Sequence, residues 1–158
     1  MTTRLGLTLT AILGLASLMA PAPVAAQDAA GMTGAAEAAF PNGAAFNGVS
    51  LKGLTLGQGM YIAQDGSATG QFQAVLLGTS PLGTPQNVTV EGEVGGGSVA
   101  ADGSATFSGT ATVDMGDGTL PLSGVPFTVT ASAGSLGLIL NAVALPTATV
   151  TAGSITIK

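Results

Sequence analysis

The chain has 158 residues, of which 7% are charged, and its formal net charge is −5. It contains no cysteine, histidine or tryptophan, which excludes disulfide bonds, thiolate and imidazole metal sites, and cysteine or histidine catalysis. Its three cationic side chains are too few and too scattered for the basic patch that nucleic-acid binding needs.

Residues 1–26 have the pattern of a secretory signal peptide. Arg4 supplies a positive start, an apolar run follows from Leu5 to Ala20, and Val24-Ala25-Ala26 fits the small-residue cleavage rule. The apolar run is shorter than the ~20 residues of a membrane-spanning helix. We therefore expect a secreted protein (extracellular, periplasmic or attached to the cell surface) whose mature chain begins at Gln27 and has no transmembrane span.

Residues 27–44 are rich in alanine and differ from the rest of the chain. Alanine is the best helix former, and Pro41 would end a helix that started near Asp28. Isolated helices of this length are marginal in water, so a flexible tether fits equally well. We expect either a short helix or a linker here, without chemistry of its own.

From residue 45 to residue 158 the sequence alternates between apolar and polar residues, which is typical of half-buried antiparallel strands. The clearest stretch is Ser104 to Met115, in which Phe107 and Val113 should be buried. Thr106, Thr110 and Thr112 should be exposed. We expect one antiparallel β-sandwich of roughly eight strands. The other predicted strands are Val49–Leu56, Phe72–Leu77, Val88–Val94, Phe127–Ser132, Leu136–Leu140, Thr147–Thr151 and Ile155–Ile157.

Turn dipeptides separate these strands. Asp65-Gly66, Asp102-Gly103 and Asp117-Gly118 are typical of two-residue hairpin turns, which need a positive φ at both positions. The segment 65–69, Asp-Gly-Ser-Ala-Thr, recurs at 102–106. Two similar halves of one sandwich would explain this repeat, and so would the common reuse of Asp-Gly turns in β-proteins.

Two pairs of carboxylates deserve consideration as sites. Glu91 and Glu93 lie on one strand face, about 6.7 Å apart by the strand rise. A glycosidase would need one such acid in a desolvated cleft and aromatic platforms nearby, so surface charge is the better interpretation. Asp114 and Asp117 flank a flexible turn that suits calcium, although calcium needs six to eight oxygen ligands and a plain hairpin turn explains the same residues.

These observations favour a secreted, non-enzymatic β-domain that acts by surface contact, as a binding module or an extracellular structural protein. Its partner would be a protein or an extracellular surface component. The sequence identifies no catalytic residue, cofactor site or metal ligand. A small outer-membrane β-barrel is the alternative, but aromatics are 4% of the chain and the threonine faces point outward, the reverse of what lipid requires. A secreted enzyme is the third possibility.

The C-terminal strand suggests self-association. Ser154 to Ile157 carries two isoleucines and no charge, and a strand at a sheet edge offers unpaired main-chain groups to another strand. If that strand is central instead, the protein stays monomeric.

Overall fold

The computed structural model describes residues 30–158, so the signal peptide predicted for residues 1–26 lies outside the described residues. Every regular element in the described range is a β-strand, and every pairing is antiparallel. This confirms the predicted all-β antiparallel domain. No helix within residues 30–158 is both long enough and apolar enough to cross a membrane. The strands are β1 (Ala30–Ala39), β2 (Ala45–Phe46), β3 (Val49–Ile62), β4 (Ser67–Thr79), β5 (Val88–Val99), β6 (Ala105–Asp114), β7 (Leu122–Ala131), β8 (Ser135–Leu140), β9 (Val143–Ala144) and β10 (Ala148–Ile157).

The strands form one sheet that closes on itself through β1. Neighbours follow the order β1-β10-β8-β7-β6-β5-β4-β3, and β1 also pairs with β3 along its whole length. The short strands β2 and β9 extend the sheet beside β3 and β8. The first and last strands of the described chain are therefore neighbours.

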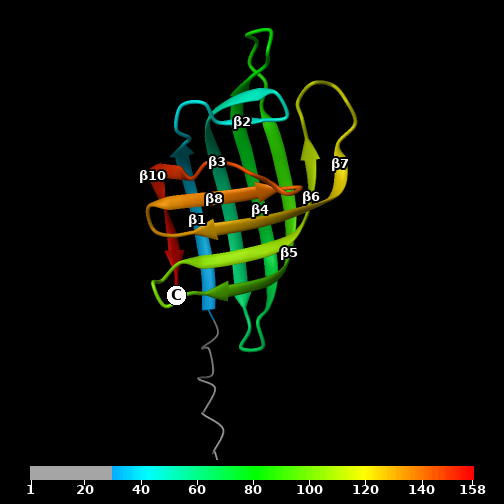
Figure 1. Ribbon diagram of the computed structural model, residues 1–158. Helices are drawn as coiled ribbons and strands as arrows, with labels where there is room; N and C mark the ends of the chain where they lie inside the picture. The colour runs from blue at the N-terminus through cyan, green and yellow to red at the C-terminus, as the bar shows by residue number, and fades with distance from the viewer. Residues whose placement is uncertain (1–29) are drawn as a thin grey trace, which may run out of the picture.

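The closed sheet is flattened into two layers. In Figure 1, β7 and β8 cross in front of β1, β3 and β4. The rings of Phe72 on β4 and Phe127 on β7 stack with centroids 5.5 Å apart, so the layers meet in the core. Both layers thus belong to one continuous sheet.

Side chains alternate between the core and the solvent as the sequence predicts. Thr110 and Thr112 are exposed, whereas Thr106 is half-buried, contrary to our prediction. Its hydroxyl lies 3.2 Å from that of Thr130 on β7, so the neighbouring strand shields it. The buried inward residues include Phe107 and Val113 on β6, Val88, Val90 and Val94 on β5, and Leu136, Leu138 and Leu140 on β8.

The alanine-rich segment is a strand, so the prediction of a helix or tether over residues 27–44 is wrong for Ala30–Ala39. Met32 and Ala36 face the core and are buried. The strand has hydrogen-bonded neighbours on both sides, and this pairing outweighs the intrinsic helix preference of alanine.

Asp65-Gly66 and Asp102-Gly103 lie in tight turns, but the turn geometry differs from our prediction, and Asp117-Gly118 lies within the longer connection between β6 and β7. Between β3 and β4, the Gly66 amide donates to the Ala63 carbonyl at 3.0 Å, and the Ala63 amide donates to the Ser67 carbonyl at 2.8 Å. Gly66 has a φ of 81°, whereas Asp65 has no positive φ. The β5–β6 hairpin repeats this pattern over residues 100–104. Both are three-residue loops in which the glycine alone is left-handed.

Candidate functional site

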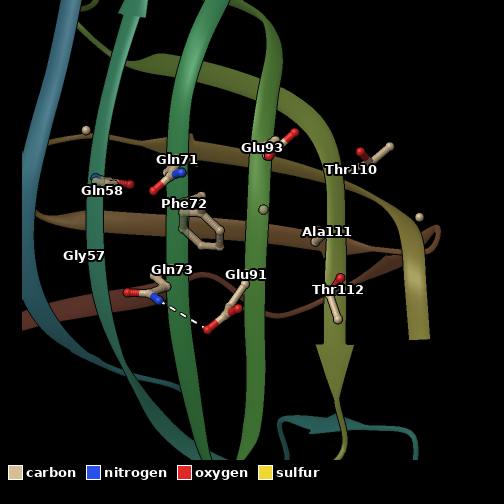
Figure 2. Close-up of a pocket in the computed structure, with 13 residues that line it drawn as sticks. Gly57, Gln58, Gln71, Phe72, Gln73, Glu91, Glu93, Thr110, Ala111 and Thr112 are labelled. Atoms are coloured by element: carbon tan, nitrogen blue, oxygen red, sulfur yellow. Dashed lines mark hydrogen bonds between the residues drawn. The ribbon is translucent and has the colours of Figure 1, made fainter. Parts of the chain in front are cut away.

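The outer face of β3, β4, β5 and β6 forms an open groove with a volume of about 550 Å³ (Figure 2). The side chains that point into it are amides, carboxylates and hydroxyls, because they occupy the strand positions that alternate with the core positions. The lining residues are Gly57, Gln58 and Gly59 on β3; Gln71, Phe72 and Gln73 on β4; Glu91, Gly92 and Glu93 on β5; Thr110, Ala111 and Thr112 on β6; and Gly124 on β7.

The polar side chains lie in two rows that cross the strands. Residues in a row are direct cross-strand neighbours, so their side chains stand beside one another. The first row is Gln71, Glu93 and Thr110, and the second is Gln73, Glu91 and Thr112. In the second row, Gln73 Nε2 donates to Glu91 Oε1 at 3.3 Å, as the dashed line in Figure 2 shows.

Glycines shape the groove from both faces of the sheet. Gly57 and Gly59 lie at the β3 side of the groove, and a Cβ added at either would meet nothing within 4 Å. Gly92 faces the core, and a Cβ there would lie 2.6 Å from Cε1 of Phe127. The Phe127 ring therefore packs against the β5 backbone, directly beneath the position between Glu91 and Glu93. The absence of side chains at Gly57 and Gly59 thus leaves space on the outer face of β3. The absence of a side chain at Gly92 allows the Phe127 ring to lie close to the β5 backbone.

The charged groups that line the groove are two carboxylates, and no lysine lies among them. Glu91 and Glu93 are both exposed on the outer face, as the sequence predicts. Neither Lys52 nor Lys158 lines the groove. Gln71 on β4 adds an uncharged amide that can donate and accept hydrogen bonds. The surface therefore offers acceptors and negative charge to a ligand, together with a smaller number of donors.

Gln58 borders the groove between the two outward glycines, but its side chain is buried. Neither Nε2 nor Oε1 has a hydrogen-bond partner among residues 30–158. The amide lies beside Gly34 on β1, where an added Cβ would be in ordinary contact with Nε2 at 3.5 Å. An unpaired buried amide costs free energy, so Gln58 is a local weakness beneath the groove.

The turn aspartates accept hydrogen bonds from residues of their own loops. Asp65 Oδ1 accepts hydrogen bonds from the amide and hydroxyl of Ser67, at 2.9 and 2.6 Å. Asp102 binds Ser104 and Asp117 binds Thr119 in the same way. These bonds favour the charged carboxylate and lower the pKa of each of the three groups below its ordinary value.

The proposed calcium turn shows the same self-contained pattern. Asp114 Oδ1 accepts a hydrogen bond from the Gly116 amide at 2.8 Å, and Asp117 Oδ1 accepts one from the Thr119 amide at 2.9 Å. Within residues 30–158 the structure brings together no group of three or more acidic side chains that could hold a metal ion. Calcium binding at this turn stays an untested alternative to a plain turn, and the observed role of both carboxylates is to order the β6–β7 loop.

Comparisons with protein-family models, with curated proteins and with solved structures give no match. Function is therefore inferred from the groove's own chemistry. Sequence reasoning considered Glu91 and Glu93 but interpreted them as surface charge, and it missed Gln71 and Gln73. The signal was present in three polar-apolar-polar triplets, Gln71-Phe72-Gln73, Glu91-Gly92-Glu93 and Thr110-Ala111-Thr112, which pair in register on adjacent strands.

Proposed function

We propose that the protein is an exported, non-enzymatic binding domain that contacts its partner through the groove on β3–β6. The groove itself carries this proposal: it is a concave surface of about 550 Å³ on an outer face whose polar side chains converge from three adjacent strands. Ligand sites are usually concave and combine a few directed polar groups with a rigid frame. Here the frame is a sheet with paired neighbours on both sides of every groove strand.

The chemistry of the groove favours a positively charged partner. Glu91 and Glu93 supply two negative charges, and the flanking amides and hydroxyls can hydrogen-bond to ammonium or guanidinium groups. Phe72, the aromatic residue at this position, is buried, so the groove presents no ring for stacking against a sugar. We infer that lysine and arginine side chains of a partner protein fit this surface best.

Contact rather than catalysis is supported by the residues present. The sequence has no histidine or cysteine, and both glutamates of the groove are exposed to solvent. Acid catalysis by a carboxyl group generally needs a desolvated site, which this open face does not provide. Export is supported by the signal-peptide pattern of residues 1–26.

A lysine oligopeptide is a suitable probe for the groove. We expect the protein to bind it in a salt-sensitive manner, and the double variant Glu91→Gln/Glu93→Gln to weaken binding about tenfold, which corresponds to ~1.4 kcal/mol. The control Asp65→Asn/Asp102→Asn removes the same charge from two hairpin turns outside the groove. Isothermal titration calorimetry measures all three. Equal weakening in both double variants would show a net-charge effect and contradict the proposal.

Export has its own test. N-terminal sequencing of protein recovered from the medium or periplasm should begin at Gln27. A soluble cytoplasmic product that retains Met1 would contradict export without affecting the binding proposal.

A further inference from the structure

β10 has one paired edge and one open edge along most of its length. It pairs with β1 from Thr149 to Ile157, but with β8 only at Ala148 and Thr149. Beyond these, the Val150 amide donates to the Gly134 carbonyl at 3.0 Å. Residues 151–154 are all exposed although they lie within the strand, and no other strand of residues 30–158 pairs with β10.

The hydrogen-bond pattern shows which groups face the open edge. Gly31 and Lys158 exchange two main-chain hydrogen bonds, of 2.7 and 2.9 Å. Because such pairs alternate along an antiparallel ladder, Ser154 and Thr156 also direct their N–H and C=O groups toward β1. The main-chain groups of Ile155 and Ile157 therefore point the other way, away from β1.

The open edge lacks the features that usually prevent strand addition. Such edges normally carry a charged residue, a proline or a bulge. Residues 148–157 contain no charged residue and no proline. The bulge in the β1–β10 pairing lies at Glu37 and Ala38, and Gly153 has a φ of 77°, so both irregularities precede Ser154. From Ser154 to Ile157 the edge is regular, and the buried side chain of Ile155 anchors it to the core.

We propose that this edge pairs with the same edge of a second copy of the chain, antiparallel and centred on Ile155. An edge that pairs with itself satisfies two-fold symmetry, in which the same patch serves both copies. In this register Lys158 of each copy lies opposite Ala152 of the other copy. The neighbour of Ala152 on β1 is the exposed Glu37, so a cation of one copy is brought toward a carboxylate of the other.

The outward side chains of the edge also suit this pairing. Ser154 of one copy would stand opposite Thr156 of the other, and both are exposed in the single chain. Hydroxyl pairs of this kind stabilise neighbouring strands, and the protein already has one at Thr106 and Thr130. The edge lies on β10 rather than on the groove strands, so this proposal is independent of the proposed function.

Sedimentation equilibrium over a concentration series tests the proposal. We expect the wild type to shift from monomer to dimer and Ser154→Lys to remain monomeric, because the introduced lysine would be a diagonal neighbour of its own counterpart and of Lys158 across the interface. Thr149→Lys is the matched control: it adds the same charge to the same strand at an exposed position that is paired on both sides. It should dimerise like the wild type. A mixture of Ser154→Glu and Ser154→Lys should recover the dimer.

Amide hydrogen exchange on the wild type provides a readout that needs no variant. The amides of Ile155 and Ile157 should exchange quickly in dilute solution and become protected as concentration rises. Those of Ser154 and Thr156 should be protected throughout by their bonds to β1. A wild type that stays monomeric at high micromolar concentration would overturn the proposal. So would a dimer in which Ile155 and Ile157 stay unprotected, or one that Ser154→Lys leaves intact.

Discussion

The two faces of β4, β5 and β6 have opposite chemistry at the same height in the sheet. On the inner face, Phe72 stacks on Phe127, and Gly92 leaves room for the Phe127 ring. On the outer face, the immediate neighbours along each strand are glutamine, glutamate and threonine. The inner residues make close contacts in the core, whereas the outer residues line the proposed binding groove. The core and the proposed binding surface are therefore separated by a single residue step, and substitutions can test them independently.

The largest difference should appear on β6. Phe107 is fully buried and Thr110 is exposed. We expect Phe107→Ala to lower the free energy of unfolding by about 3–5 kcal/mol, since it removes a large core side chain. Thr110→Ala should change it by less than about 0.5 kcal/mol. Urea denaturation measures both, and equal effects would refute the assignment of the two faces.

Glycines give a second comparison between the faces. Gly92→Ala should lower the free energy of unfolding by about 1–3 kcal/mol, because the new methyl group would overlap the Phe127 ring. Gly57→Ala should raise it by about 0.4–1 kcal/mol, because the position is open and the substitution restricts the unfolded chain. A double-mutant cycle with Phe127→Leu is the check, since the cost of Gly92→Ala should shrink when the ring is absent.

Gln58 is a buried polar residue on the otherwise apolar inner face. Replacing it with an apolar residue should therefore make the two faces differ more. Gln58→Met keeps the shape of the side chain and removes two unpaired polar atoms. We expect stability to rise by roughly 1–2 kcal/mol. The control Gln58→Glu should lower stability strongly, because it introduces a buried charge. A thermal melt in which Gln58→Met is less stable than the wild type would show that the amide has a partner in solution.

The smallest effect concerns the hairpin aspartates. The serine and threonine hydrogen bonds hold the pKa of Asp65, Asp102 and Asp117 below the ordinary value of 3.8 in the folded chain. The folded state therefore binds fewer protons than the unfolded state in this range. The stabilisation is present above the ordinary pKa and is lost as the pH falls through the lowered folded values.

Urea midpoints at neutral pH and at about pH 3 should show this loss. A triple variant with Asp65→Asn, Asp102→Asn and Asp117→Asn should depend less steeply on pH, because asparagine keeps the acceptor oxygen without titrating. If the urea midpoint of the triple variant depended on pH as steeply as that of the wild type, other carboxylates would be responsible for the acid sensitivity.

Alternation and turn residues predicted most of this fold because each has a local cause. The period of two on β6 follows from one buried face, and Asp-Gly turns are stabilised within a few residues. The strand at Ala30–Ala39 could not be predicted in this way, since its alanines favour a helix locally and one of its two partners, β10, lies at the other end of the described chain. The same applies to the groove: its residues were readable as outward positions, but its hollow depends on Gly57, Gly59 and the distant Phe127.

Because β1 closes the sheet, the order of the strands along the chain can be changed by circular permutation. Gly31 and Lys158 are hydrogen-bonded to each other, so a short linker could join them as an ordinary hairpin loop. New termini could then be opened in the β4–β5 connection around residues 80–86. In such a circular permutant, the pairing of β10 with β1 becomes local instead of spanning the whole described chain. The pairing of β4 with β5 becomes the long-range one in its place, so the permutant should fold at a rate close to that of the natural order while keeping every strand pairing.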